Sequence, residues 1–172
     1  AQERAQNLFT SAQQVSFPKG AIIRTVLDDV PPEALANGAT LMHEHVTTLS
    51  PTTFDEEGAM VRLPPSGSNR QETLALLLDE LKAAREDGLT CLVDAGIRPP
   101  RTGAEFEEAR NLSKQSSLHL VMAWGSTSAN WVGERTEEDI TAELLRDAKA
   151  QRWGAFGEVA SGLEGISPND RK

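Results

Sequence analysis

The chain has 172 residues, a formal net charge of −9 at pH 7, 38% apolar residues and 25% charged residues. This length suffices for one domain with a substantial hydrophobic core, and the composition is ordinary for a globular protein. The negative charge argues against nucleic acid or an anionic membrane as a partner, because both attract basic surfaces. The sequence has no run of about 18 apolar residues, so we expect no transmembrane helix.

Cys91 is the only cysteine, which excludes a disulfide within the chain. It lies in an apolar run, so we predict a buried core thiol. The chain begins with Ala1 rather than with Met. This start fits removal of a leader during secretion or export to the periplasm, and it equally fits a trimmed cytoplasmic protein. The expected compartment therefore stays open.

The first part of the chain predicts two short strands between irregular stretches. Residues 1–20 show no sustained period and are interpreted as an amino-terminal arm. Residues 22–27 are β-branched and apolar, which favours a strand, and a second strand is predicted at 39–43. Residues 47–69 are rich in Pro, Ser, Thr and Gly and predict a long loop, a feature that is more often functional than idle in a compact domain.

Helices and strands alternate over the rest of the chain. Asn69 is the expected N-cap of a helix that ends at Gly88, with Glu72 as its capping-box partner. Thr102 and Thr136 are expected to cap two further helices. The apolar runs beside these helices predict three more strands, at 89–94, 118–123 and 154–159.

This order predicts an α/β domain over residues 21–172, with a parallel sheet and helices packed against it. The runs Leu92-Val93 and Leu120-Val121 suit strands that are buried on both faces. No glycine-rich GxGxxG turn follows any strand, so a dinucleotide site has no support. Residues 161–172 are expected to form a loop.

The strongest local signal is the pair His43 and His45. Residues i and i+2 of a strand point to the same face, so both imidazoles project one way while Glu44 points the other way. Two imidazoles on one side suit a divalent metal. A bare HxH motif is weak, however, and two neutral core histidines are an alternative of similar weight.

Glu158 is the second signal, because it ends the otherwise apolar strand 154–159. A carboxylate there is costly unless it is paired, hydrogen-bonded or bound to a metal. The alternative is a side chain that turns out to solvent where the strand ends.

Several other residues have structural explanations beside functional ones. Asp94 could orient a ligand histidine, although capping of the following loop is the stronger expectation. Arg98 and Arg101 could bind an anion or pair with Asp94. His119 starts its strand, at the end opposite the candidate site, and is interpreted as structural. The three tryptophans are expected to pack in the core, and two of them could instead line a pocket: Trp124, Trp131 and Trp153, of which the first two flank a strand end.

These segments resemble the phosphotriesterase-like branch of the amidohydrolase superfamily. Residues 38–45, which carry the two histidines, are similar to the first-strand metal motif of those hydrolases, and residues 24–32 to their amino-terminal hairpin. Residues 89–95 resemble the second strand. Residues 157–159 resemble the fourth-strand segment of the subgroup in which a glutamate, rather than a carboxylated lysine, bridges two metals.

The resemblance implies a (β/α)8 barrel of the TIM type, with the site at the carboxyl ends of its strands. It implies two divalent metals, most often zinc, with His43 and His45 on one metal and Glu158 bridging both. The implied reaction is attack of metal-activated water on a small-molecule phosphotriester, lactone, or other ester or amide. The loop 47–69, which leaves the strand just after His45, should then hang over the pocket.

The chain departs from this family pattern in length. A full barrel of this type takes about 250 residues or more, and this chain supplies about four strands. No residue here matches the later metal histidines or the proton-accepting aspartate, so no catalytic residue is assigned. We therefore expect an incomplete barrel that is inactive or nearly so alone. The alternatives are a half-barrel that self-associates or pairs with a missing half, and a relative that binds metal or ligand without turnover.

Overall fold

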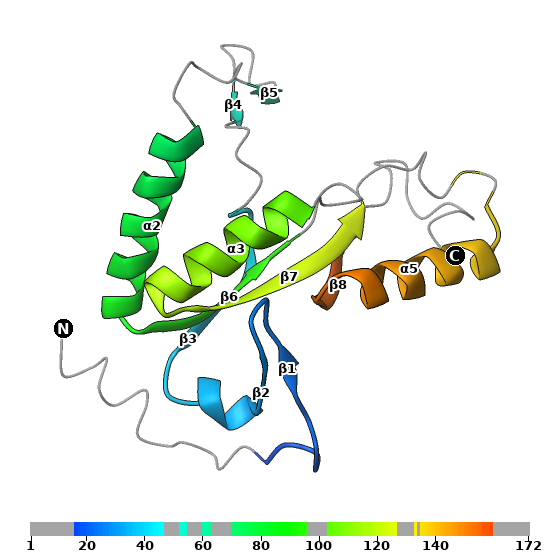
Figure 1. Ribbon diagram of the computed structural model, residues 1–172, viewed down its shortest axis with the longest axis horizontal. Coiled ribbons are helices and arrows are strands. Elements are labelled where there is room, and N and C mark those ends of the chain that lie inside the picture. Colours follow the sequence, from blue (N-terminus) through cyan, green and yellow to red (C-terminus); the bar gives the residue numbers. More distant parts are fainter. Residues whose placement is uncertain are drawn as a thin grey trace.

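Four parallel strands form the central sheet of the protein (Figure 1). The computed structural model describes residues 16–46, 52–54, 60–62, 70–95, 103–126, 133 and 135–159. The strands pair in chain order, each with the preceding one: β3 (Ala39–Glu44), β6 (Leu89–Asp94), β7 (His119–Ser126) and β8 (Trp153–Val159). This arrangement confirms the predicted partial barrel of the TIM type, and within the described residues the sheet does not close on itself.

Three helices connect these strands, as the sequence predicts: α2 (Arg70–Glu86), α3 (Gly103–Ser116) and α5 (Glu137–Ala150). The predicted cap at Thr136 is confirmed, because its side chain accepts the Asp139 N–H while Asp139 completes a capping box. Gly88 follows α2 with φ +102, a conformation that favours glycine, and its carbonyl accepts the first N–H of β3. The other expected caps, Asn69 and Thr102, lie outside the described residues.

The main hydrophobic cluster lies between the sheet and the helices. Phe106, Ala109 and Leu112 of α3 pack with Leu92, Leu120, Met122 and Trp124 of the central strands. Each such buried side chain contributes roughly 1.5–3 kcal/mol relative to exposure. The rings of Phe106 and Trp153 meet edge to face, with centroids 4.8 Å apart, and Trp124 donates its Nε1–H to Asp147 of α5 at 3.2 Å. Packing roles are thereby confirmed for two tryptophans, while Trp131 lies outside the described residues.

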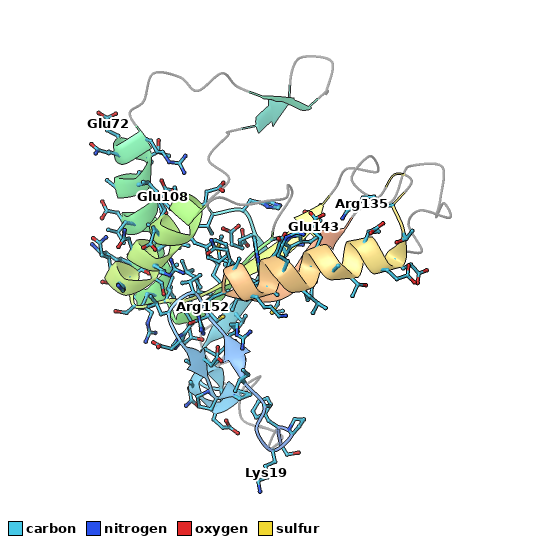
Figure 2. All side chains as sticks on the ribbon, turned by 45° about the vertical axis from the view of Figure 1, so that its right-hand side comes forward. Lys19, Glu72, Glu108, Arg135, Glu143 and Arg152 are labelled. Carbon is cyan, nitrogen blue, oxygen red and sulfur yellow. The ribbon has the colours of Figure 1, made fainter. Side chains whose placement is uncertain are left out.

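Charged side chains cover the exposed helix surfaces (Figure 2). Arg70 of α2 pairs with Glu108 of α3, and Arg135 pairs with Glu143 of α5. Leu145 of α5 is 56% exposed. No described helix is both long and apolar enough to cross a lipid bilayer.

A smaller apolar cluster lies on the opposite face of the sheet. Cys91, Val93, Val121 and Ala123 are buried there, and Ile23 and Leu35 of the amino-terminal segment pack against them together with Ala155. Cys91 is 1% exposed, and burial raises the pKa of its thiol to about 11. The predicted buried thiol is therefore confirmed, and it is protonated at neutral pH.

The amino-terminal segment is a small hairpin followed by one 3-10 turn. β1 (Ile23–Arg24) pairs antiparallel with β2 (Asp29–Val30), and η1 (Pro32–Leu35) follows. The prediction of a strand over 22–27 is wrong in its second half. The strand ends early because the Oγ1 of Thr25 accepts the backbone N–H of Asp28 at 3.0 Å, which reverses the chain.

Arg152 fastens this hairpin to the start of β8. Its Nε donates to the Thr25 carbonyl at 3.1 Å, and its guanidinium also pairs with Asp29, which is held by Arg24 as well. Figure 2 shows Arg152 where the hairpin meets the body of the protein. The Val26 N–H donates to the Leu120 carbonyl at 2.8 Å, which adds a second fastening on β7.

The prediction of an irregular loop over 47–69 needs correction. β4 (Thr52–Phe54) pairs antiparallel with β5 (Met60–Arg62), so a short ribbon interrupts the segment. Its β-branched and aromatic residues favour a strand, whereas the proline-rich sequence on either side favours a loop. The other residues of the segment lie outside the described residues, and its expected position over the pocket stays a prediction.

We predict that Gly154→Ala destabilises the protein, because a Cβ at this position would lie 2.1 Å from the backbone oxygen of Arg24. Overpacking against backbone costs about 1–3 kcal/mol, so the free energy of unfolding in urea should fall by that amount. Gly103→Ala is the matched control, since its Cβ would meet nothing closer than 3.9 Å. Equal stability of the two variants would contradict the close approach of hairpin and sheet.

Candidate metal centre

The two sequence-predicted histidines and the predicted glutamate meet in the structure. His43 and Glu44 are the last two residues of β3, and His45 follows directly. Glu158 is the second-last residue of β8. The Nε2 of His43 lies 3.1 Å from Oε2 of Glu158, and the Nε2 of His45 lies 3.5 Å from the same oxygen. β3 and β8 are the two outer strands of the four, so the curvature of the sheet brings their carboxyl ends together.

A β-bulge in β3 gives the two histidines their direction. Leu41 pairs with Leu92, and Glu44 pairs with Asp94, so three steps along β3 match two steps along β6. Leu92 and Asp94 share a face of β6, and paired residues on adjacent strands point the same way. Glu44 therefore lies on that face, as predicted, and His43 and His45 project to the opposite face, which carries the Cys91 cluster.

β8 has a corresponding irregularity before Glu158. Trp124 pairs with Phe156 and Ser126 pairs with Val159, so three steps along β8 match two along β7. Glu158 lies within this irregular stretch, and its Oε2 is 3.1 Å from the Nε2 of His43. Two bulges on opposite strands therefore turn all three polar side chains toward the same side of the sheet.

The imidazole of His45 is held by the backbone. Its Nδ1 lies 2.9 Å from the carbonyl oxygen of Ala95, just past the end of β6. A carbonyl oxygen only accepts, so Nδ1 carries the proton in the neutral ring and Nε2 presents a lone pair toward Glu158. This arrangement is typical of metal-ligating histidines, in which the second ring nitrogen donates to an acceptor behind it.

The three side chains fit a divalent metal in chemistry and in spacing. Nitrogen and oxygen donors at about 2.0–2.2 Å around a tetrahedral ion stand roughly 3.3–3.6 Å apart. The measured 3.1 and 3.5 Å are close to this, and the ligand atoms of the three residues all lie within 4.8 Å of one another. No other cluster of three such ligands occurs in the described part of the chain.

The candidate ligands are accessible. The side chain of His43 is 59% exposed, that of His45 39% and that of Glu158 32%. The rings of the histidines stand nearly perpendicular, 5.3 Å between centroids. A ligand or substrate can therefore approach the site from solvent without any rearrangement of the core.

Asp94 is 1% exposed, and its Oδ1 accepts the backbone N–H of Val46, two residues past the end of β3, at 3.2 Å. The loop that Asp94 is expected to cap lies outside the described residues, so that role stays a prediction. Arg98 and Arg101 lie outside the described residues, so their expected pairing stays a prediction. The carbonyl of Ala95 is a contributor that sequence reasoning missed, since a backbone acceptor leaves no signal in the residue type.

His119 lies where the sequence predicts. It begins β7 and pairs in register with Cys91, near the amino ends of the strands, whereas the metal candidates stand near the carboxyl ends. It is partly buried. The third histidine is thus separate from the candidate centre, which makes it a useful control.

No protein-family model matches this sequence, and no curated protein sequence matches it. Among solved structures, the chain is similar to a weak promiscuous lactonase template engineered for organophosphate hydrolysis, at 23% identity and a TM-score of 0.53. It is also similar to a triple mutant of organophosphorus hydrolase from Deinococcus radiodurans, at 20% identity and a TM-score of 0.54.

Both matches cover 88% of this chain but only 48% and 47% of the solved chains, so the chain spans about half their length. At this identity the similarity establishes the fold. Both solved structures are TIM barrels, and the open four-stranded sheet of this chain corresponds to part of such a barrel.

Proposed function

We propose that this chain belongs to a phosphotriesterase-like, metal-dependent hydrolase and carries part of its metal centre. The observation behind the proposal is the convergence of His43, His45 and Glu158 from two outer strands onto one accessible point. TIM-barrel active sites lie at the carboxyl ends of the strands, where these three residues stand. The fold similarity to a lactonase template and to an organophosphorus hydrolase supports the same class.

The expected substrates are small phosphotriesters, lactones, or other esters or amides. A divalent ion bound at such a site lowers the pKa of a bound water and polarises a phosphoryl or carbonyl oxygen. The residues of this chain supply two imidazole nitrogen donors and one carboxylate, so His43, His45 and Glu158 would hold the ion. Because the side chain of His43 is 59% exposed, a substrate has room to bind beside it.

Zinc is the expected metal, because imidazole and carboxylate ligands in an open three-residue set are typical of catalytic zinc sites. The described residues provide one such set, so we expect one tightly held ion per chain. With three protein ligands and no assigned proton acceptor, hydrolysis by this chain alone should be slow or absent.

We predict that the purified protein binds close to one zinc ion, and that His43→Ala and Glu158→Ala each weaken zinc binding by at least about tenfold, since each removes one of three ligands. Elemental analysis after dialysis and competition with a chromogenic chelator measure this directly. His119→Ala is the matched control and should retain the metal, because His119 starts β7 at the far end.

Metal that is absent from the wild type, or that survives both ligand substitutions in a folded protein, would contradict the metal centre. A phosphotriester and a lactone with chromogenic leaving groups then distinguish hydrolysis from binding alone. Zinc-dependent turnover, however slow, that is lost in Glu158→Ala supports the hydrolase. Stoichiometric zinc without turnover agrees with both candidates, and the association state of the protein then distinguishes them.

The second candidate is a non-catalytic, metal-binding half-barrel that associates with a second copy. The observation that favours it is the exposure of large apolar side chains on the outer strands: Met42 of β3 is 70% exposed and Phe156 of β8 is 67% exposed. Each of these strands has one hydrogen-bonded neighbour among the described residues. Open parallel edges with apolar side chains favour pairing with another chain.

If this association occurs, Met42→Ser and Phe156→Ser should raise the dimer dissociation constant by about tenfold or more, because each removes apolar surface from the contact. Sedimentation velocity over a range of concentrations measures it. Leu145→Ser is the control, since Leu145 is 56% exposed but belongs to the helix α5 and not to an outer strand. A monomeric wild type, or an equal effect of all three variants, would exclude this candidate.

A further inference from the structure

The residues at the end of β6 hold the chain around His45 at three points. The Ala95 N–H donates to the Glu44 carbonyl at 2.7 Å. The Ala95 carbonyl lies 2.9 Å from Nδ1 of the His45 ring. Oδ1 of Asp94 accepts the Val46 N–H at 3.2 Å. Asp94, the last residue of β6, and Ala95, which follows it, thus contact the residue before His45, the His45 ring, and the residue after it.

These contacts fix both peptide groups that flank His45. The Glu44 carbonyl belongs to the peptide that precedes His45, and the Val46 N–H belongs to the peptide that follows it. Peptide groups are planar, so holding one on each side restricts the two backbone dihedrals of His45 and therefore the direction of its Cβ. Two of the three contacts are backbone groups of Ala95 and survive most substitutions, whereas the contact to Val46 depends on the Asp94 side chain.

Asp94 is an expensive residue to place here for a structural purpose alone. It is 1% exposed, beside Leu92 and Val93 in an apolar strand, and burial of a carboxylate is unfavourable because it loses hydration. A carboxylate is, however, a stronger acceptor for a backbone N–H than a neutral group. This carboxylate accepts the N–H of Val46, the residue directly after the candidate metal ligand His45.

We propose that Asp94 is a positioning residue of the metal centre, which directs the lone pair of His45 Nε2 by fixing the peptide that follows His45. This inference rests on the proposed metal site. Asp94 acts through the backbone and the ring orientation of His45, and its carboxylate does not serve as a ligand.

The test compares three substitutions. Asp94→Leu removes the acceptor while keeping the number and branching of the side-chain heavy atoms, and Asp94→Asn keeps an oxygen able to accept the Val46 N–H. Thr90→Val is the matched control, because the Thr90 hydroxyl donates to the Ala39 carbonyl at 3.1 Å and so joins the same two strands at their amino ends. Thermal unfolding of each variant separates a loss of fold from a loss of site geometry.

The first readout is cobalt(II) binding, whose visible spectrum reports coordination geometry. Loss of an outer contact behind a metal ligand typically weakens binding 10- to 100-fold. We expect Asp94→Leu to weaken cobalt binding by at least about tenfold and to alter its spectrum, Asp94→Asn to recover most of the affinity, and Thr90→Val to match the wild type. Equal losses in Asp94→Leu and Thr90→Val would overturn the proposal, because general loosening of the strand pair would then explain both.

The second readout needs no metal. Nitrogen-15 NMR of the histidine rings in the metal-free protein, above the titration range of histidine, should show His45 protonated at Nδ1 in the wild type and in Asp94→Asn, and a mixture of tautomers in Asp94→Leu. A wild-type His45 protonated mainly at Nε2, or a tautomer unchanged in Asp94→Leu, overturns the positioning role. Correct tautomers in a protein that binds no cobalt would instead retain the positioning and refute the proposed metal function.

Discussion

The contact between Glu158 and the two imidazoles joins the outer strands of a four-stranded sheet. The backbone hydrogen bonds run only between neighbours, from β3 to β6, β7 and β8, so no ladder links the first strand to the last. What links them is sheet curvature, which moves the carboxyl ends of β3 and β8 close enough for oxygen and nitrogen atoms to lie 3.1 and 3.5 Å apart. A flatter sheet with the same pairing would leave three unrelated polar side chains.

Two packed layers maintain this curvature. On one face α3 and its partners cover the strands with the large cluster around Phe106 and Leu120, and on the other the hairpin packs Ile23 and Leu35 onto Cys91. Arg152 links the hairpin to β8 by bonds to Thr25 and Asp29. The apolar layers and this polar fastening thereby influence the distance between β3 and β8, on which the proposed metal site depends.

The order of elements could be predicted from the sequence because it depends on local signals. The cap at Thr136 and the buried run around Cys91 are examples, and so is the shared direction of His43 and His45, which follows from strand alternation. The bulges before His43 and Glu158 could not be predicted, since a bulge is defined by the register of the neighbouring strand. The meeting of Glu158 with the histidines depends on tertiary curvature, and the Ala95 carbonyl has no signature in the residue type. The turn at Thr25 could not be predicted, because a β-branched residue favours a strand unless its hydroxyl accepts a nearby backbone N–H.

The separation of the ligands along the chain also orders the assembly of the site. Within the central sheet each strand pairs with the preceding strand of that sheet, so the sheet can grow from its amino-terminal end as the chain is made. The ligands are different, because His43 and Glu158 are 115 positions apart. Their convergence requires β6 and β7 to be in place and β8 to have docked. In a partly folded chain, His43 and His45 are therefore present without Glu158 beside them. A metal ion that needs all three side chains would bind tightly only after β8 has paired with β7.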